Sequence, residues 1–126
     1  MDAPKELKIL ENYTRFVVEG EISIEEIIDR VAAAIRYCRE KKIPRLLVDL
    51  TRLKVSHAPL THERYWAARR WAAEAGSTLV VAAVAQKELI DVERFGLLVA
   101  QNADMRAFIS SDENEAVAWL LTQEAF

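Results

Sequence analysis

The sequence predicts a single α/β domain, with a mixed five-stranded sheet packed against four helices in the order ββαβαβαβα. Of its 126 residues 52% are hydrophobic, and only three are glycine and three proline, which is typical of one compact domain spanning residues 1–126. From Arg45 onward, wholly apolar runs alternate with segments of helical periodicity. Such alternation requires parallel strands joined by crossovers. Two short strand-like segments precede the first helix and add an antiparallel pair.

The first elements are a hairpin and an amphipathic helix. Lys8–Leu10 and Thr14–Val18 are short apolar and β-branched segments separated by Glu11-Asn12, a pattern typical of a hairpin. Ser23 followed by Glu26 has the spacing of a capping box at a helix start. The buried stripe of this helix is expected to comprise Ile24, Ile27, Ile28, Val31, Ile35 and Cys38.

The middle of the chain contains two further strands around a second helix. Leu46–Val48 is an apolar run of the kind that forms a strand covered on both faces. Thr61 is the expected N-cap of a helix that ends near Ala75, where Gly76 can take a left-handed conformation. The run Thr78–Ala85 is the next strand.

The C-terminal third predicts a helix, a strand and a last helix. The third helix is expected from about Glu88 to Gln101, followed by a strand at Met105–Ile109. Ser110 or Ser111 can then cap a final helix over Asp112–Leu121, whose acidic first turn suits the helix dipole.

Composition excludes several classes of function. The net charge of −3 gives no basic face for nucleic acid, so no nucleic-acid partner is expected. Cys38 is the only cysteine, which excludes an internal disulfide and favours a reducing compartment. The first residues lack an apolar signal segment, and the longest apolar run, Leu79–Ala85, is far shorter than a membrane span. A cytoplasmic protein without a membrane span is expected.

Three segments together resemble the STAS (anti-sigma-factor antagonist) domains, within them the SpoIIAA-like branch. They are VVEGEIS before the first helix, RLLVDLTRL as the central strand and the closing MRAFISSDENEAVAWLL. The resemblance covers nearly the whole chain, and its specificity lies in the order and spacing of the segments. It implies a regulatory domain that binds a protein partner, with an apolar groove or a dimer surface near the third helix.

The phosphorylation switch of the anti-sigma-factor antagonists is absent here. In those proteins an Asp-Ser pair follows the strand that LLVDL resembles, and its serine is phosphorylated. Counting from Asp49, the corresponding residues are His57 and Ala58. Ser56 and Thr61 lie close by and could accept phosphate at a helix N-terminus, but capping is a sufficient role for Thr61.

The same loop contains residue types that can carry catalysis. His57, His62, Asp49, Ser56 and Thr61 lie within fifteen residues and allow a nucleophile-base-acid interpretation. The structural interpretation is favoured, because an Asp at a strand end usually accepts hydrogen bonds from loop amides. No catalytic or phosphate-binding motif accompanies these residues. Two histidines without a cysteine also make a weak metal site, so no metal or cofactor is expected.

The second helix carries an aromatic residue on each face. The core stripe is expected to comprise Tyr65, Ala68, Trp71, Ala72 and Ala75. Trp66 projects to the opposite side beside His62, Arg69 and Arg70. There it is either covered by the arginine stems or it anchors a partner.

The third helix has more apolar residues than one face needs. Val92, Phe95, Val99 and Ala100 can face the sheet, whereas Ile90 and Leu97 point away. Gly96 within it indicates close packing or a local opening.

A non-catalytic binding module is the favoured interpretation. It binds a protein partner or a small apolar ligand through Ser56, His57, Thr61, His62, Trp66 and Arg70, and a homodimer stays open. One alternative is a small hydrolase or transferase using His57 or His62 with Asp49. Another is a lipid carrier, which rests on analogy of fold and predicts an enclosed apolar cavity between the third helix and the sheet.

Overall fold

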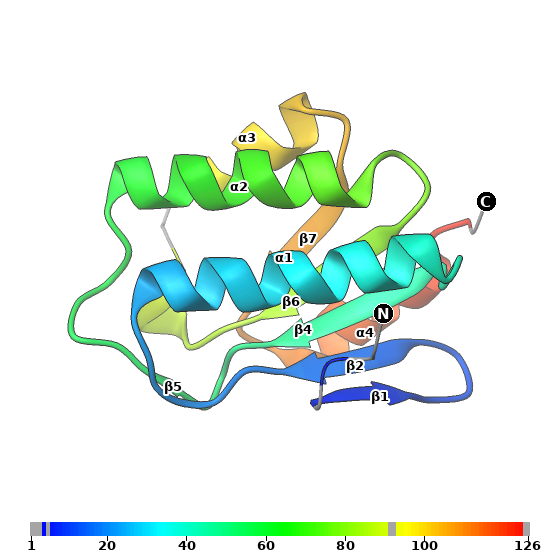
Figure 1. Ribbon diagram of the computed structural model, residues 1–126, viewed down its shortest axis with the longest axis horizontal. Helices are drawn as coiled ribbons and strands as arrows, with labels where there is room; N and C mark the ends of the chain where they lie inside the picture. The colour runs from blue at the N-terminus through cyan, green and yellow to red at the C-terminus, as the bar shows by residue number, and fades with distance from the viewer. Residues whose placement is uncertain (1–3, 5, 91–92, 125–126) are drawn as a thin grey trace.

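The protein is a mixed β-sheet with helices packed on both of its faces (Figure 1). The structure is a computed structural model that describes residue 4, residues 6–90 and residues 93–124. The main sheet has the order β1-β2-β4-β6-β7, in which β1 pairs antiparallel with β2 and all other pairs are parallel. This confirms the predicted mixed five-stranded sheet. Its strands are β1 (Leu7–Ile9), β2 (Thr14–Val17), β4 (Arg45–Asp49), β6 (Val80–Val84) and β7 (Arg106–Ser110).

The helices are distributed unequally over the two faces of the sheet. One face is covered by α1 (Ile24–Glu40), α2 (Thr61–Ala75) and α3 (Phe95–Asn102), and the other by α4 (Glu113–Thr122). Within the three-helix layer, α2 packs between α1 and α3. The sequence did not predict the small parallel pair of β3 (Gly20–Glu21) and β5 (Leu53–Lys54), nor the 3-10 turn at Lys87–Leu89.

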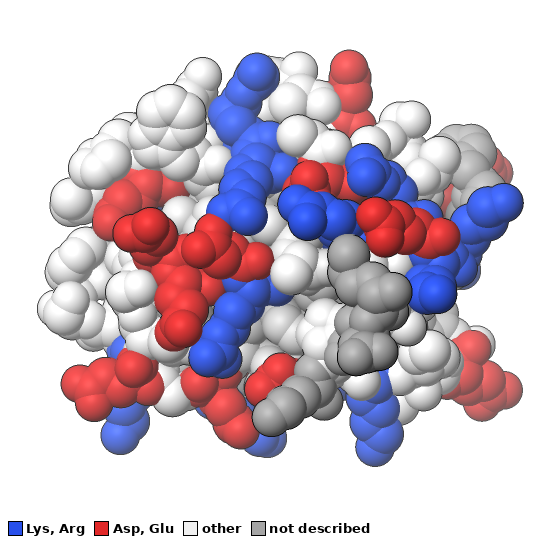
Figure 2. All heavy atoms as spheres, viewed as in Figure 1, with Lys and Arg blue, Asp and Glu red and all other residues white. Residues whose placement is uncertain are grey.

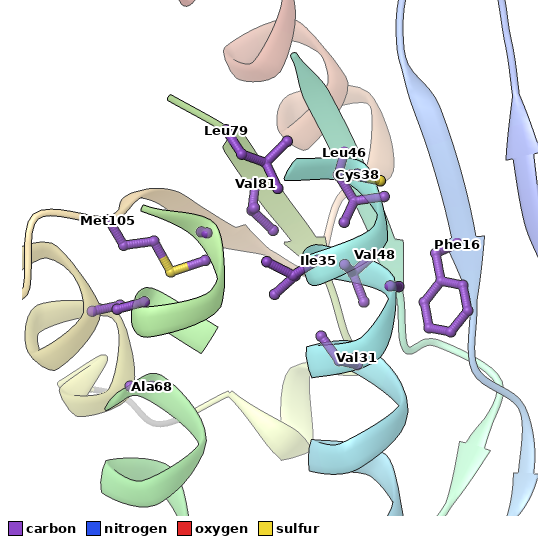
Figure 3. Close-up of a cluster of buried hydrophobic side chains, with 14 of the residues drawn as sticks. Phe16, Val31, Ile35, Cys38, Leu46, Val48, Ala68, Leu79, Val81 and Met105 are labelled. Carbon is purple, nitrogen blue, oxygen red and sulfur yellow. The ribbon is translucent and has the colours of Figure 1, made fainter. Parts of the chain in front are cut away.

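The central strand β4 divides the core into two parts. Leu46 and Val48 face the three-helix layer, whereas Leu47 packs on the α4 side, so the strand is covered on both faces as predicted. Figure 3 shows the larger cluster, in which Val31, Ile35 and Cys38 of α1 lie near β4. Cys38 is fully buried, and burial raises the pKa of its thiol to about 12. On the other side, Trp119 of α4 stacks on Phe108, with ring centroids 5.2 Å apart.

The predicted N-cap residue is confirmed for α1 and is wrong for α2 and α4. Ser23 caps α1 by accepting a hydrogen bond from the Glu26 amide at 3.1 Å, as predicted. Thr61 is not the N-cap of α2, because the chain is extended up to Leu60 and Thr61 is already helical. The Glu63 carboxylate instead accepts from the Leu60 amide at 2.8 Å. Asp112, rather than either preceding serine, caps α4 by accepting from the Asn114 amide at 2.9 Å.

The third helix is shorter than predicted. It begins at Phe95, because Arg94 takes a left-handed conformation with φ of 52° that a helix cannot continue through. Ile90 and Leu97 do not point away from the sheet, since both line the cavity described below. The predicted sheet-facing position Val92 lies outside the described residues. The helix α2 ends at Ala75 as predicted, and Gly76 takes a positive φ of 62° with an extended ψ of −158°.

Candidate functional site

An apolar cavity of about 180 Å³ lies between α2 and the sheet. Its floor is formed by Val81 and Ala83 of β6 and by Ala107 of β7, and α1 and α3 form its sides. In Figure 3, Ala68 of α2, Val81 and Met105 come from three different parts of the chain and surround the same space. The parallel strands bring these segments together, although they are far apart in the sequence.

Small side chains on both sides of this space leave it unfilled. The face of α2 turned to the sheet presents Ala67 and Ala68, and the strand below presents Ala83 followed by Ala85. Across from them, α3 contributes Gly96 and Ala100. A helix normally fills the gap above a sheet with larger aliphatic side chains, because protein interiors are close-packed. Alanine side chains on both sides are too short to fill this gap, so the volume between them stays open.

Contacts between α1 and α2 hold the roof of the cavity in place. The indole Nε1 of Trp71 donates to the carbonyl of Ile28 at 3.0 Å, and both residues line the cavity. On the outer surface, Arg36 forms an ion pair with Glu74, and Arg70 forms one with Asp29. Figure 2 shows side chains of both charges across the face formed by α1 and α2. Helices fixed to each other in this way can keep a fixed distance from the sheet without filling it.

The charged side chains that line the cavity are Glu63, Arg64 and Arg94. The Arg64 guanidinium donates from Nε to the carbonyl of Pro59 at 3.1 Å and from Nη1 to the carbonyl of Leu89 at 3.0 Å. It therefore ties the loop before α2 to the segment after β6. Arg94 lines the cavity and is also solvent-exposed, so the cavity reaches the surface at this side.

The six residues predicted to bind a partner or ligand lie outside this cavity. Ser56 and His57 are exposed in the loop before α2, and the His57 ring Nδ1 lies 2.8 Å from the Ala58 carbonyl oxygen. Thr61 and His62 are exposed in the first turn of α2. The predicted residues thus lie either in the loop before α2 or on the face of α2 turned away from the cavity. The full set comprises Ser56, His57, Thr61, His62, Trp66 and Arg70.

Trp66 stands in solvent with 63% of its surface exposed. Its ring contacts Tyr65 edge to face, with centroids 5.5 Å apart, and the described residues place no arginine over it in a cation–π contact. Tyr65 was predicted to face the core but is 41% exposed, because the inward face of α2 runs through Ala68, Trp71 and Ala75. Uncharged residues form the surface at this end of α2 and its preceding loop, at the left in Figure 2.

Asp49 is buried and serves the structure of the loop that follows it. Its carboxylate accepts from the Thr51 amide at 2.9 Å and from the Thr51 hydroxyl at 2.6 Å, and it forms an ion pair with Arg15. Burial raises the pKa of this carboxyl, but the Thr51 hydrogen bonds and the Arg15 charge outweigh burial and set the pKa below its ordinary value. No hydrogen bond or ion pair among the described residues joins Asp49 to His57 or His62.

Across residue 4 and the ranges 6–90 and 93–124, no group of three or more His, Cys, Asp or Glu side chains is arranged to hold a metal ion. The helices of the same ranges do not combine the length and apolar character needed to cross a bilayer.

Comparison of the chain with protein-family models, with curated proteins and with solved structures gave no match.

The sequence contained a signal for the cavity that the periodicity of large apolar residues does not reveal. The alanines Ala67, Ala68, Ala83 and Ala107 occupy inward positions of α2, β6 and β7, where larger residues would be expected. Inward alanines on two elements that face each other indicate either unusually close approach or a void. The sequence does not report the spacing of the layers, so it could not distinguish these outcomes.

Proposed function

We propose that this protein is a non-catalytic binding module that takes one small apolar molecule into the cavity under α2. The observation that carries the proposal is an apolar space between the helical layer and the sheet, which reaches the surface beside Arg94. Ligand sites in proteins are typically concave, mostly apolar and preformed. An empty space of this kind costs stability, because the atoms around it lack packing partners. A ligand that fills it recovers those contacts.

The volume sets the size of the apolar group. An engineered cavity of roughly 150 Å³ lined by aliphatic and aromatic side chains binds benzene. The cavity of about 180 Å³ is slightly larger, so a single ring or a short alkyl chain matches it. Each methylene removed from water contributes about 0.8 kcal/mol. Burial of an apolar group of this size therefore gives weak binding by itself, before any polar contact is added.

The test is a titration of methyl-labelled protein with toluene, followed by NMR. We expect the methyl signals of Ile27, Val81 and Leu97, which line the cavity, to shift with saturation. The methyl signals of Leu47 and Leu120, on the α4 side of the sheet, serve as an internal control and stay in place.

The variant Ala67→Leu fills the cavity from α2 and is expected to abolish these shifts. Its stability should be unchanged or raised by up to about 1 kcal/mol, because the added methyl groups occupy empty space rather than displacing neighbours. Ala73→Leu is the matched control: it makes the same change on the exposed face of the same helix and should bind toluene like the parent. Unchanged toluene binding in Ala67→Leu, or no saturable shift in the parent protein, would contradict the proposal.

The predicted resemblance to SpoIIAA-like STAS domains is compatible with this function but independent of it. In that interpretation the protein is a regulatory module without the phosphorylatable serine, and the ligand would modulate capture of a protein partner. The exposed aromatic pair Tyr65 and Trp66 supports such a partner surface, because large exposed aromatics are enriched at interaction sites. The carrier alternative shares the cavity. Native mass spectrometry of protein purified from cells tests it directly, since a carrier should retain an apolar molecule of matching mass.

A further inference from the structure

We infer that the ligand of the cavity is a carboxylate with a short apolar body, whose anionic head pairs with Arg94 and Arg64. This rests on the proposed function and names the chemical class of the ligand. The body of the cavity offers no polar specificity, because its floor and roof are apolar, with Phe108 and the Trp71 indole among the aliphatic side chains, and the indole N–H is already bonded to Ile28. Any polar selectivity therefore comes from the charged residues in the lining.

The Arg94 side chain lines the exposed side of the cavity. It makes no hydrogen bond or ion pair with any residue in the described part of the chain. Its backbone is held in the left-handed region, which lets α3 start directly beyond it. Non-glycine residues rarely adopt this conformation, so the chain places a long cation at the cavity entrance at some conformational cost.

Arg64 lies on the same side of the cavity. A Cβ atom added at Gly96, two residues after Arg94, would lie 3.7 Å from the Arg64 Cβ atom. The first turn of α3, which directly follows Arg94, therefore packs against Arg64. Nε and Nη1 of Arg64 each donate one bond, to Pro59 and Leu89, while a guanidinium carries five N–H donors. Donors on both arginines remain for an incoming ligand.

The acidic residue in the lining does not cancel this charge. Glu63 already accepts the Leu60 amide at the start of α2, which is a structural role at a helix N-terminus. Among the described lining residues, Arg64 and Arg94 carry two positive charges against the one negative charge of Glu63, so the charged side of the apolar space is net positive. A planar carboxylate matches the fork of an arginine and can accept two parallel hydrogen bonds from it. A ligand with an apolar body and a carboxylate head satisfies both halves of the site at once.

Three ligands with one alkyl chain and different heads test this inference: octanoate, octanol and octylamine, each titrated at pH 7 and low salt and followed by the methyl signals of Ile27 and Leu97. We expect octanoate to bind about five- to tenfold more tightly than octanol, the effect of charge-assisted hydrogen bonds at a partly exposed site. Octylammonium should bind more weakly than octanol. Raising the salt concentration should reduce the advantage of octanoate and leave octanol unchanged.

Arg94→Gln should lower octanoate affinity to near that of octanol without changing octanol affinity. Arg69→Gln, which removes an exposed arginine of α2 outside the cavity lining, is the matched control and should behave like the parent. Equal binding of all three ligands, a preference for octylammonium, or an unaltered octanoate affinity in Arg94→Gln would overturn the inference while leaving the apolar binding function intact. Absence of binding by all three ligands and by toluene would instead overturn the proposed function.

Discussion

At the scale of single residues, Asp49 shows how a conspicuous polar side chain can belong to the fold. Its position at the end of β4 invites a functional interpretation, but the sequence favoured the prediction that it accepts hydrogen bonds from the loop. The Thr51 contacts confirm the second prediction. The ion pair with Arg15 was not predictable, because it depends on the parallel register in which Val17 of β2 pairs with Asp49.

Asp49 should make the stability of the protein fall in acid. Its pKa is lowered in the folded state, so its contribution is fully present above the ordinary value near 3.9 and is lost as the pH falls through the folded-state pKa. Urea unfolding between pH 7 and pH 2 should show this loss, and Asp49→Asn should be less stable at pH 7 with a flatter profile below pH 4. Glu11→Gln, in the exposed hairpin turn, is the control and should keep the parent profile. Parallel profiles for Asp49→Asn and the parent would refute this role.

At the scale of elements, the strands were more predictable than the helix ends. The apolar runs that became β4 and β6 are buried on both faces, so their hydrophobicity leaves little choice of structure. The start of a helix depends on which nearby oxygen accepts from the free amides there. In α2 the Glu63 carboxylate does this in place of Thr61, and in α4 the Asp112 carboxylate does it in place of the two serines. The predicted third helix was too long because apolar residues continue upstream of Arg94, and no sequence pattern indicates the left-handed backbone at Arg94 that precedes the helix.

Gly96 in α3 offers a direct test of how tightly the helical layer is packed. A methyl group added there would meet Arg64 at 3.7 and 3.8 Å, which is ordinary van der Waals contact, and the residue has no positive φ that would require glycine. Gly96→Ala should therefore raise the free energy of unfolding by about 0.5–1 kcal/mol, because alanine loses less backbone entropy in a helix. Chemical denaturation measures this change. Gly76→Ala, at a positive φ, is the contrasting variant and should destabilise. A destabilised Gly96→Ala would mean that α2 and α3 cannot accommodate the added methyl group.

At the scale of the whole molecule, each face of α2 suits a different kind of binding. The inward face, with Ala67, Ala68 and Trp71, lines the cavity, and the outward face carries Trp66 and the arginines. Large apolar and aromatic residues made the outward face conspicuous in the sequence. The inward face drew no attention, because alanine is compatible with both a close helix–sheet contact and a void. Only the arrangement of all three helices over the sheet distinguishes the two.

Trp66 should matter for association between molecules rather than for folding. With Leu60 it presents two large apolar side chains more than half exposed at one end of α2, and a patch of this kind can pair with itself in a twofold dimer. If it does, sedimentation velocity at increasing concentration should show the mass of the parent rising above 14.3 kDa, and Trp66→Ala should shift this rise to higher concentration. The free energy of unfolding should change by less than about 0.5 kcal/mol, as is usual for exposed positions. Leu121→Ala removes an exposed apolar side chain from α4, on the opposite face of the sheet, and should associate like the parent. A large loss of stability in Trp66→Ala, or equal association in all three proteins, would show that Trp66 takes no part in an interface.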